Sequence, residues 1–393
     1  TTGSSTALVD ASLGQMYYAD YQANKKIKHF DLSFGATSNM SQITSYVFGN
    51  HFSKNFSLYQ QTEFSKGKLD LQAGFRLEYC QLNQQTPETN YKWFGQTLPI
   101  FPIVRLGAHY ELQKSTHLRA SFGQGIRFPA VAERYISTSV GGLRIFQNPD
   151  LRSEEGWAAE VGVKQILVLG RWKAMLDIAG FVNAYDNMTE FAFGVFKPDT
   201  MATLQTTNPA AINYFYNWVG FQAQNAEKAR ITGLEFSMNS TGQIGEVEVL
   251  TLVGYTYMNP ISLNKDPIYL ATFSDTTSNL LKYRFRHLAK ADVELTYQKF
   301  GLGISARYNS HMPNIDLAFE DGILGTEILV GMSKYREQFN KGVPVFDVRF
   351  NYEFSEHLKG NLILNNFTNA EYVSRPGAVQ APRNLVVQFQ WVL

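Results

Sequence analysis

The 393-residue chain has few of the features that would mark a disulfide-stabilised or helical membrane protein. Its single cysteine, Cys80, excludes an intrachain disulfide framework and a thiolate metal cluster. Charged residues make up only 18%, against roughly 25% in an average soluble domain. No stretch of about 18 consecutive apolar residues occurs, which excludes a spanning helix.

Large net charge and nucleic-acid-binding character are also lacking. A formal net charge of +1 gives no electrostatic reason to expect a nucleic-acid partner. The first ten residues, TTGSSTALVD, have neither a basic nor an apolar region, so we expect no signal peptide there. Aromatic residues, in contrast, reach 14%, which argues against disorder.

The dominant pattern that is present is an alternation of apolar and polar residues with a period of two. It runs through residues 69–80, where Leu71, Phe75 and Leu77 alternate with polar neighbours, and again through residues 346–354. This period predicts two-faced β-strands, and no stretch of similar length has a helical period. The chain is therefore predicted to be all-β.

The pattern predicts about sixteen strands joined alternately by short and long connections. The expected strands lie near residues 5–19, 28–37, 41–49, 53–64, 68–82, 101–112, 115–123, 155–168, 171–193, 215–240, 244–258, 286–298, 300–310, 343–354, 357–366 and 384–393. Long links are expected at 83–100, 124–154, 194–214, 259–285, 311–342 and 367–383. One short link, at 49–51, falls where a long one is expected, and indicates either a short loop or a misplaced boundary.

An antiparallel meander with short turns at one end and long loops at the other is typical of a transmembrane β-barrel. Backbone groups in lipid must all be paired, so the strands must close without a free edge. The alternative is a soluble sandwich or propeller. Several expected strands have 11 residues or more, which suits the roughly 9–11 residues that a tilted strand needs to cross a bilayer. The barrel is therefore preferred.

Four segments resemble TonB-dependent outer-membrane receptors. They are residues 120–164, with ASFGQGIRFPAVAERY, NPDLRSEE and EVGVK; residues 226–238, AEKARITGLEFSM; residues 71–79, LQAGFRLEY; and residues 364–393, LNNFTNAEYVSRPGAVQAPRNLVVQFQWVL. The resemblance implies a 22-stranded barrel around an N-terminal plug domain. Residues 1–393 would then be the C-terminal part of such a barrel, with about sixteen strands, and without the plug and the first strands.

The resemblance implies active uptake of a scarce, large substrate across the outer membrane of a Gram-negative bacterium. A ferric siderophore is the favoured substrate, and haem, cobalamin or a glycan are alternatives. Implied partners are the lipid bilayer and the TonB complex, which would act through a plug outside this chain. The rival hypothesis is a complete, passive 16-stranded porin. No catalytic signature is present, so we expect no enzyme, and we expect no cofactor or metal site.

Candidate substrate-binding residues lie in the expected long loops, because loops on a rigid scaffold carry function. They are Arg127, Tyr135, Arg144, Tyr372 and Arg375. Arginine suits an acidic chelate because its planar fork binds carboxylates in a bidentate manner. The competing interpretation is that Arg127 and its Arg-x-Pro box only hold a strand end and contact the plug. In the haem-binding branch of the family that the sequence resembles, a histidine between the Arg-x-Pro and Asn-Pro-x-Leu boxes ligates the iron. No histidine lies between Phe128 and Leu151 here, so haem is disfavoured as the substrate.

Charged side chains also alternate along single strands, as with Asp292 and Glu294, or Asp347, Arg349 and Glu353. They share a strand face, and such a placement would also suit a carboxylate site. We interpret them instead as lumen charges that are solvated or paired across strands.

Overall fold

A computed structural model describes residues 12–83, 92–93, 96–97, 99–140, 143–197, 202–203, 218–321 and 327–392. Within these ranges, fifteen strands have eight residues or more. They are β1 (Leu13–Ile27), β2 (Phe30–Ser45), β3 (Gly49–Lys66), β4 (Leu69–Leu82), β7 (Phe101–Gln113), β8 (Thr116–Arg127), β11 (Glu154–Leu169), β12 (Trp172–Lys197), β14 (Val219–Ile244), β15 (Val247–Ser262), β16 (His287–Tyr297), β17 (Phe300–Asn309), β18 (Val343–Glu353), β19 (Leu358–Asn365) and β20 (Asn384–Trp391). The all-β prediction is confirmed.

The remaining described elements are short and lie in the long connections. The strands are β5 (Lys92–Trp93), β6 (Gln96–Thr97), β9 (Thr138–Val140), β10 (Leu143–Phe146) and β13 (Ala202–Thr203). The helices are α1 (Val131–Tyr135), α3 (Pro267–Leu270), the 3-10 turn η2 (Leu317–Phe319) and α4 (Met332–Gln338). No helix in the described ranges is long and apolar enough to cross a membrane.

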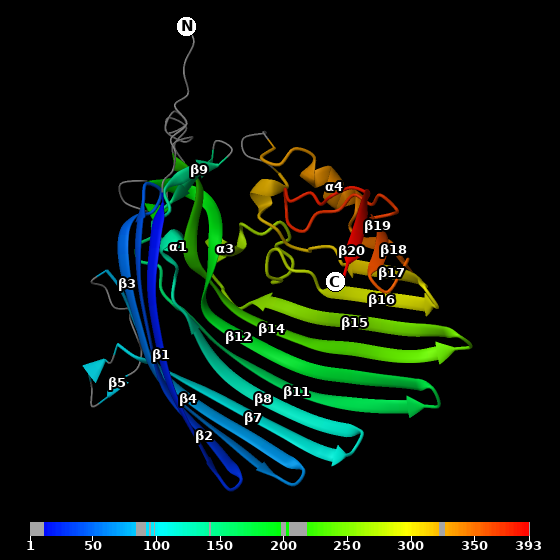
Figure 1. Cartoon of the computed structure of the whole chain (residues 1–393). Coiled ribbons are helices and arrows are strands. Elements are labelled where there is room, and N and C mark those ends of the chain that lie inside the picture. Colours follow the sequence, from blue (N-terminus) through cyan, green and yellow to red (C-terminus); the bar gives the residue numbers. More distant parts are fainter. Residues whose placement is uncertain are drawn as a thin grey trace. The chain divides into compact units, whose positions relative to one another are not determined.

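The long strands form an antiparallel meander in which each strand pairs with its neighbour in the sequence. This pairing is continuous from β1 to β4 and from β14 to β20. All fifteen belong to one 18-stranded sheet that also includes β9, β10 and β13. Figure 1 shows β14 and β15 side by side, joined by a tight turn.

The predicted alternation sorts side chains onto two faces. In β17, Ile304 lies opposite Val293 of β16 and Val348 of β18, so the three apolar side chains form one row. We call the side of β15–β20 that carries such rows the apolar face. Its large side chains are exposed, with Ile304 at 45% and Phe350 at 52%. A soluble sandwich would bury these rows against a second layer, so that alternative is disfavoured.

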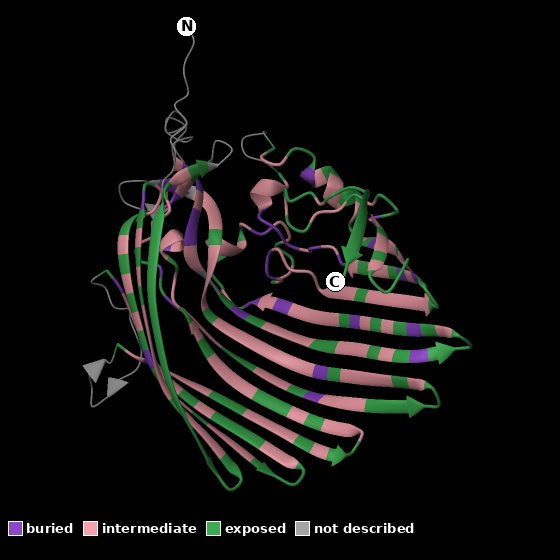
Figure 2. Cartoon of the chain, in the orientation of Figure 1, coloured by how far each residue is buried: buried purple, intermediate pink, exposed green. Residues whose placement is uncertain are grey.

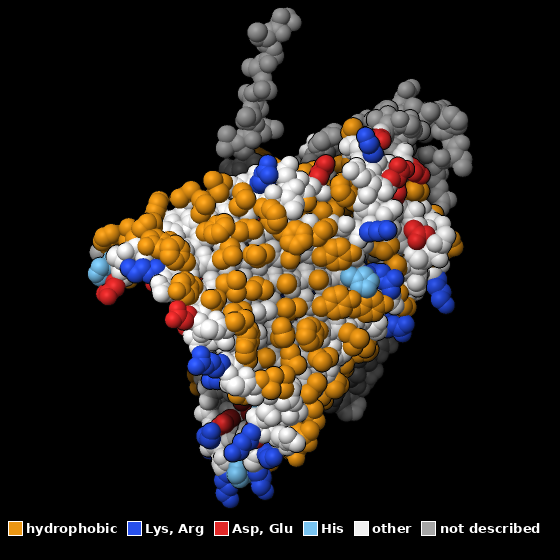
Figure 3. Space-filling model, turned by 90° about the vertical axis from the view of Figure 1, so that its right-hand side faces the viewer, with side chains coloured by type: hydrophobic (Ala, Val, Ile, Leu, Met, Phe, Trp, Pro, Cys, Tyr) orange, Lys and Arg blue, Asp and Glu red, His pale blue; other side chains and the backbone are white. Residues whose placement is uncertain are grey.

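The next residue along each strand belongs to the opposite side, the polar face. Ser305 of β17 lies opposite Asp292 of β16 and Asp347 of β18. Figure 2 shows exposed and partly buried positions interspersed along the long strands. Figure 3 shows a face of the molecule on which hydrophobic side chains form a broad field, with charged side chains gathered toward its margins.

The first strands differ from the prediction in their boundaries. Residues 28–37 and 41–49 were expected as two strands, but β2 runs unbroken from Phe30 to Ser45. Residues 38–40, which were expected to link these two strands, are themselves strand and pair with residues 54–56 of β3. The Ser41 and Ser53 hydroxyls add a 2.6 Å contact between the same two strands. The anomalous short link is real, and residues 46–48 form it.

A second boundary error concerns a glycine in β14. The link predicted at residues 240–244 is strand, and the turn follows at Gly245, whose φ is +61°. That left-handed conformation favours glycine. Gly242 serves a different purpose, because any Cβ there would collide with the ring of Trp172 in β12. Sequence alone does not distinguish a glycine that turns the chain from one that admits a neighbouring ring.

The chain divides into two compact units. The first contains residues 1–108, 122–157 and 185–228, and the second contains residues 109–121, 158–184 and 229–393. In the second unit, residues 263–286, 310–321 and 327–342 fold together as a lobe, here called the loop lobe. Its buried centre is Met312, Ile315 and Met332, and Tyr283 and Tyr335 pack against it.

Candidate functional site

A cavity of about 680 Å³ lies in the second unit, bounded by strands of the sheet and by the long connections that follow β17 and β19. Polar-face side chains of the strands reach it, including Glu235, Lys290 and Arg307. The loop lobe contributes His311 and Tyr335, among others. The volume falls within the roughly 300–1,000 Å³ of small-molecule sites.

The cavity combines positive charge with aromatic surface. Arg307 and Arg336 line it together with Tyr335, Phe339 and Tyr372. Arginine binds anionic groups, and tyrosine offers both a ring and a hydroxyl. The cavity is therefore suited to an aromatic or chelated ligand that carries negative charge.

Two of its arginines are held in place by the fold. Arg336 of α4 donates to the carbonyl oxygens of Met312 (2.9 Å) and Pro313 (3.1 Å), and its Nε lies 3.3 Å from a Glu320 oxygen. Arg307 of β17 lies 3.0 Å from a carboxylate oxygen of Asp347 in β18. Each guanidinium is thus oriented before any ligand arrives, which lowers the entropic cost of binding.

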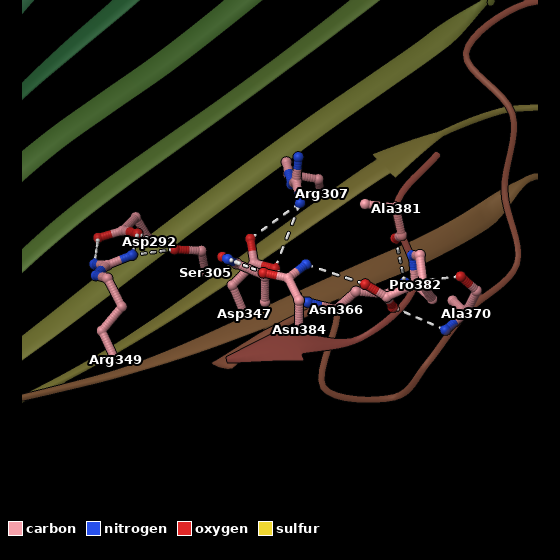
Figure 4. Close-up of polar contacts among 11 residues, drawn as sticks. Asp292, Ser305, Arg307, Asp347, Arg349, Asn366, Ala370, Ala381, Pro382 and Asn384 are labelled. Carbon is pink, nitrogen blue, oxygen red and sulfur yellow. Dashed lines mark hydrogen bonds and ion pairs between the residues drawn. The ribbon is translucent and has the colours of Figure 1, made fainter. Parts of the chain in front are cut away.

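A ladder of charge pairs runs along the polar face beside this cavity (Figure 4). Both terminal nitrogens of Arg349 in β18 donate to Asp292 of β16, each at 2.9 Å. Ser305 of β17 lies between them, donating to Asp292 and accepting from Arg349 at 2.5 Å. Together with Arg307–Asp347, this confirms the predicted cross-strand pairing for Asp292, Asp347 and Arg349.

The upper end of the ladder connects to the loop of residues 366–383. Asp347 accepts the backbone N–H of Asn366 at 2.7 Å as well as the Arg307 guanidinium. The Asn366 side chain closes the loop, because its amide exchanges bonds of 2.8 Å with the backbone of Ala370 and also donates to Ala381 (Figure 4). Asn366 is 2% exposed and has a φ of +47°.

His311 lies in the connection after β17 and lines the cavity. Burial lowers the pKa of its imidazole, and the nearby Arg336 charge lowers that pKa further. Glu320 opposes both effects. The net result is a neutral imidazole at physiological pH, because even an unperturbed histidine titrates near pH 6.5.

The buried centre of the loop lobe contains an ion pair. Lys282 Nζ lies 2.5 Å from Asp316 Oδ1, and the two side chains are 1% and 2% exposed. The Tyr283 hydroxyl donates to the other Asp316 oxygen, and the Lys282 ammonium lies 5.2 Å from the ring centroids of Tyr269 and Phe273. Lys282 and Asp316 come from different connections, so the pair ties the two together.

Three of the predicted binding residues lie in the first unit. Arg127 ends β8 and donates to Glu133 of α1 and to Glu154 of β11, at distances of 2.6–2.9 Å. Tyr135 stacks on His51 with ring centroids 3.9 Å apart. These contacts join β8 to α1 and to the start of β11, so the Arg-x-Pro segment holds a strand end. A ligand role for Arg127 and Tyr135 stays a prediction.

The third residue, Arg144, lies in β10, which pairs in parallel with β14. Its guanidinium carbon is 5.8 Å from the ring centroid of Phe146. Tyr372 and Arg375 belong to the second unit, in the loop of residues 366–383. Tyr372 lines the cavity, whereas Arg375 is not among the residues that line it. Ligand contacts by these three residues also stay predictions.

Arg307, His311 and Arg336 line the cavity, although none of them was among the candidate binding residues predicted from the sequence. In the sequence, Arg307 looks like any other charged residue on the polar face of a strand. It differs only in lying near the end of β17 that leads into a long connection. In the described ranges, no group of three or more histidine, cysteine, aspartate or glutamate side chains is placed to hold a metal ion.

The comparisons with known proteins agree with this architecture. A family model described as TonB dependent receptor-like, beta-barrel matches residues 2–369. The fold and this match define a β-barrel of a transport-receptor class, not an enzyme class. The chain belongs to the TonB-dependent receptor β-barrel family, whose members lie in the outer membrane of Gram-negative bacteria.

Solved structures show the same fold at low sequence identity. The ferric-catecholate import receptor Fiu from E. coli K12 matches with a TM-score of 0.63 and 16% identity, covering 97% of this chain and 55% of that one. The siderophore receptor PirA from Pseudomonas aeruginosa gives a TM-score of 0.62 and 15% identity, with 98% and 58% covered. The Serratia marcescens hemophore receptor HasR gives 0.60 and 16%, with 97% and 58% covered. The chain thus spans little more than half the length of these receptors, and no curated protein sequence matches it.

Proposed function

We propose that this chain forms part of the barrel of a receptor that takes up a ferric siderophore across the outer membrane, driven by TonB. The family match supports a receptor over a passive porin. The observation that carries the substrate class is the cavity beneath the loop lobe, where Arg307 and Arg336 face aromatic side chains. A plug domain outside residues 1–393 stays a prediction.

The expected interaction with such a substrate is electrostatic. A ferric complex of catecholate or carboxylate groups carries net negative charge over aromatic or chelate rings. Guanidinium groups that are already oriented bind such an anion with charge-assisted hydrogen bonds, each worth about 1.5–3 kcal/mol. Tyr335 and Tyr372 supply stacking surface and hydroxyls at the same cavity.

The test uses the complete receptor in its own host. Cells with the intact gene, with a deletion and with the gene carrying Arg307→Gln are supplied with ⁵⁵Fe complexes of a tris-catecholate and of a tris-hydroxamate chelator under iron limitation. We expect Arg307→Gln to weaken binding of the preferred complex by about 10- to 100-fold, the equivalent of losing one such bond. Lys359→Gln, at the start of β19 and not among the residues that line the cavity, is the matched control.

Uptake that is identical in the deletion and the intact strain for every iron complex would overturn the proposal. Loss of binding in Lys359→Gln as well would show that the effect is not specific to the cavity.

Haem is the second candidate, because a neutral imidazole at the cavity can ligate iron. His311 provides one there, although the segment between Phe128 and Leu151 has none. Addition of haem to the purified receptor should then give a six-coordinate Soret spectrum that His311→Ala abolishes. An unchanged spectrum in that variant would eliminate His311 as the ligand.

A further inference from the structure

The charged side chains that line the cavity differ in whether the fold already gives them a partner of opposite charge. Arg307 and Arg336 are each held by a carboxylate, at 3.0 and 3.3 Å (Figure 4 shows the first pair). Arg119 lies 2.6 Å from Asp177, which also lines the cavity. The charge of each of these side chains is therefore balanced within the fold.

Lys290 and Glu235 line the same cavity without such a partner. In the part of the chain that the structure describes, neither side chain forms an ion pair or a hydrogen bond. Both are exposed. Lysine carries a compact ammonium that only donates, and an ionised glutamate carries a carboxylate that only accepts. Each side chain thus presents a free charge to the cavity, and the two charges are of opposite sign.

Lys290 has a defined position although it is unpaired. It lies opposite Arg307 of β17 on one side and opposite Gly254 of β15 on the other. Two cations directly opposite each other repel, and here the two side chains diverge, since the Lys290 stem lies over Gly254. A Cβ on Gly254 would be 2.9 Å from Lys290 Cε and 3.2 Å from its Cγ. Gly254 lacks a positive φ, so its missing side chain makes room for the lysine stem.

The stem of Lys290 points across β15 toward β14, where Glu235 lies. Ser237 of β14 is opposite Gly254, and Glu235 is two residues further along β14 on the same face. With strands about 4.8 Å apart and about 3.3 Å per residue, the Cα atoms of Glu235 and Lys290 are roughly 12 Å apart. Both side chains extend into this interval, yet no ion pair joins them. The interval is suited to a small group that carries charges of both signs.

We propose that the substrate carries a carboxylate and an ammonium close together, as an amino-acid group does, and that Lys290 and Glu235 bind them. The inference rests on the proposed function and narrows its substrate class to a dipolar iron chelate. Lys290 donates to the carboxylate of the substrate, and Glu235 accepts from its ammonium. Arg307 and Arg336 face the anionic chelating part, as proposed above.

The experiment uses the purified complete receptor and ferric complexes of one synthetic tris-catecholate scaffold in four forms. The scaffold carries a free amino-acid group, the same group with its carboxylate converted to an amide, the same group with its amine acetylated, or both changes. We expect the dipolar form to bind about tenfold more tightly than either singly blocked form, the equivalent of one charge-assisted hydrogen bond at an exposed site. Fluorescence titration measures the four dissociation constants.

Variants assign the two groups. Lys290→Gln should remove the preference for a free carboxylate and keep that for an ammonium, and Glu235→Gln should do the reverse. Gly254→Ala keeps both charges but displaces the lysine stem, so it should lower the carboxylate preference alone. Lys299→Gln and Glu248→Gln are the matched controls, because these exposed residues do not line the cavity, and they should leave all four affinities unchanged.

Equal affinity of the unaltered receptor for all four complexes would overturn the dipolar site, as would binding of none of them. A loss in Lys290→Gln that is the same for every complex would also overturn it, because such a loss indicates a structural role. Iron uptake by the intact and deletion strains is measured in parallel. A receptor that is required for uptake but does not prefer the dipolar form refutes this inference and leaves the proposed function intact.

Discussion

The most demanding prediction concerns the ion pair at the centre of the loop lobe. Replacing Lys282 by methionine keeps much of its volume but leaves the Asp316 carboxylate buried without its cation, at 2% exposure. Removing one partner of a buried pair costs about 3–5 kcal/mol. Because Asp316 keeps the Tyr283 hydroxyl, we expect the lower end, about 3 kcal/mol.

This loss should appear as local opening of the loop lobe and not as unfolding of the strands. Three amides bond across its two connections: Ser274 to Ile315, Tyr283 to Asn314, and Leu317 to Thr272. A loss of about 3 kcal/mol corresponds to roughly 150-fold faster exchange of these amides when exchange reports the opening equilibrium. Hydrogen–deuterium exchange of peptides spanning residues 272–283 and 312–320 measures it.

Two variants serve as controls. Lys334→Met alters an exposed lysine of α4 and should leave exchange unchanged. Lys282→Met combined with Asp316→Asn removes both charges and should recover most of the protection, because a neutral amide at position 316 can still accept from Tyr283. Exchange in Lys282→Met within threefold of the unaltered protein would refute the reasoning, since it would mean that the pair contributes almost nothing to the loop lobe.

Two other predictions follow from the same unit. Asn366→Ala should lower the free energy of local unfolding of residues 366–383 by about 2–3 kcal/mol. The variant loses the buried hydrogen bonds to Ala370, and alanine tolerates the positive φ at this position less well than asparagine. Limited proteolysis measures the change, and the control Asn365→Ala should behave as the unaltered protein. Because the pKa of folded His311 lies below its unfolded value, exchange protection of the loop lobe should be constant above about pH 6.5 and fall as pH drops through the folded pKa. His311→Gln should give protection factors that do not change over this range, and an identical fall in that variant would assign the effect to another group.

The long connections of the second unit are folded and held by hydrogen bonds, and this favours ligand binding. In the loop lobe, the backbone of residues 272–283 bonds to that of residues 314–317, and α4 anchors Arg336 to the carbonyls of Met312 and Pro313. A cavity built on such a folded lobe presents its cations in fixed positions. Binding then costs less conformational entropy than the ordering of two free loops would.

The repeat of two residues and the alternation of short and long links were sufficient to predict the fold class and most strands. Side chains in a strand alternate by geometry, so local sequence alone sorts Leu302 and Ile304 from Gly303 and Ser305. The local sequence predicted the wrong conformation for residues whose conformation depends on a neighbouring strand. Residues 38–40 were expected as a link but are strand and pair with β3, and Gly242 was expected in a link but lies in a strand against the ring of Trp172.

The candidate site depended on tertiary structure to a greater degree. Asp292 and Arg349 are 57 residues apart, and their bidentate pair exists only because the register of β16, β17 and β18 places them together with Ser305. The local chain dictates on which face a residue lies, because backbone geometry is local. Which residues meet is decided by strand register and loop packing, because those contacts join segments that are distant in the sequence.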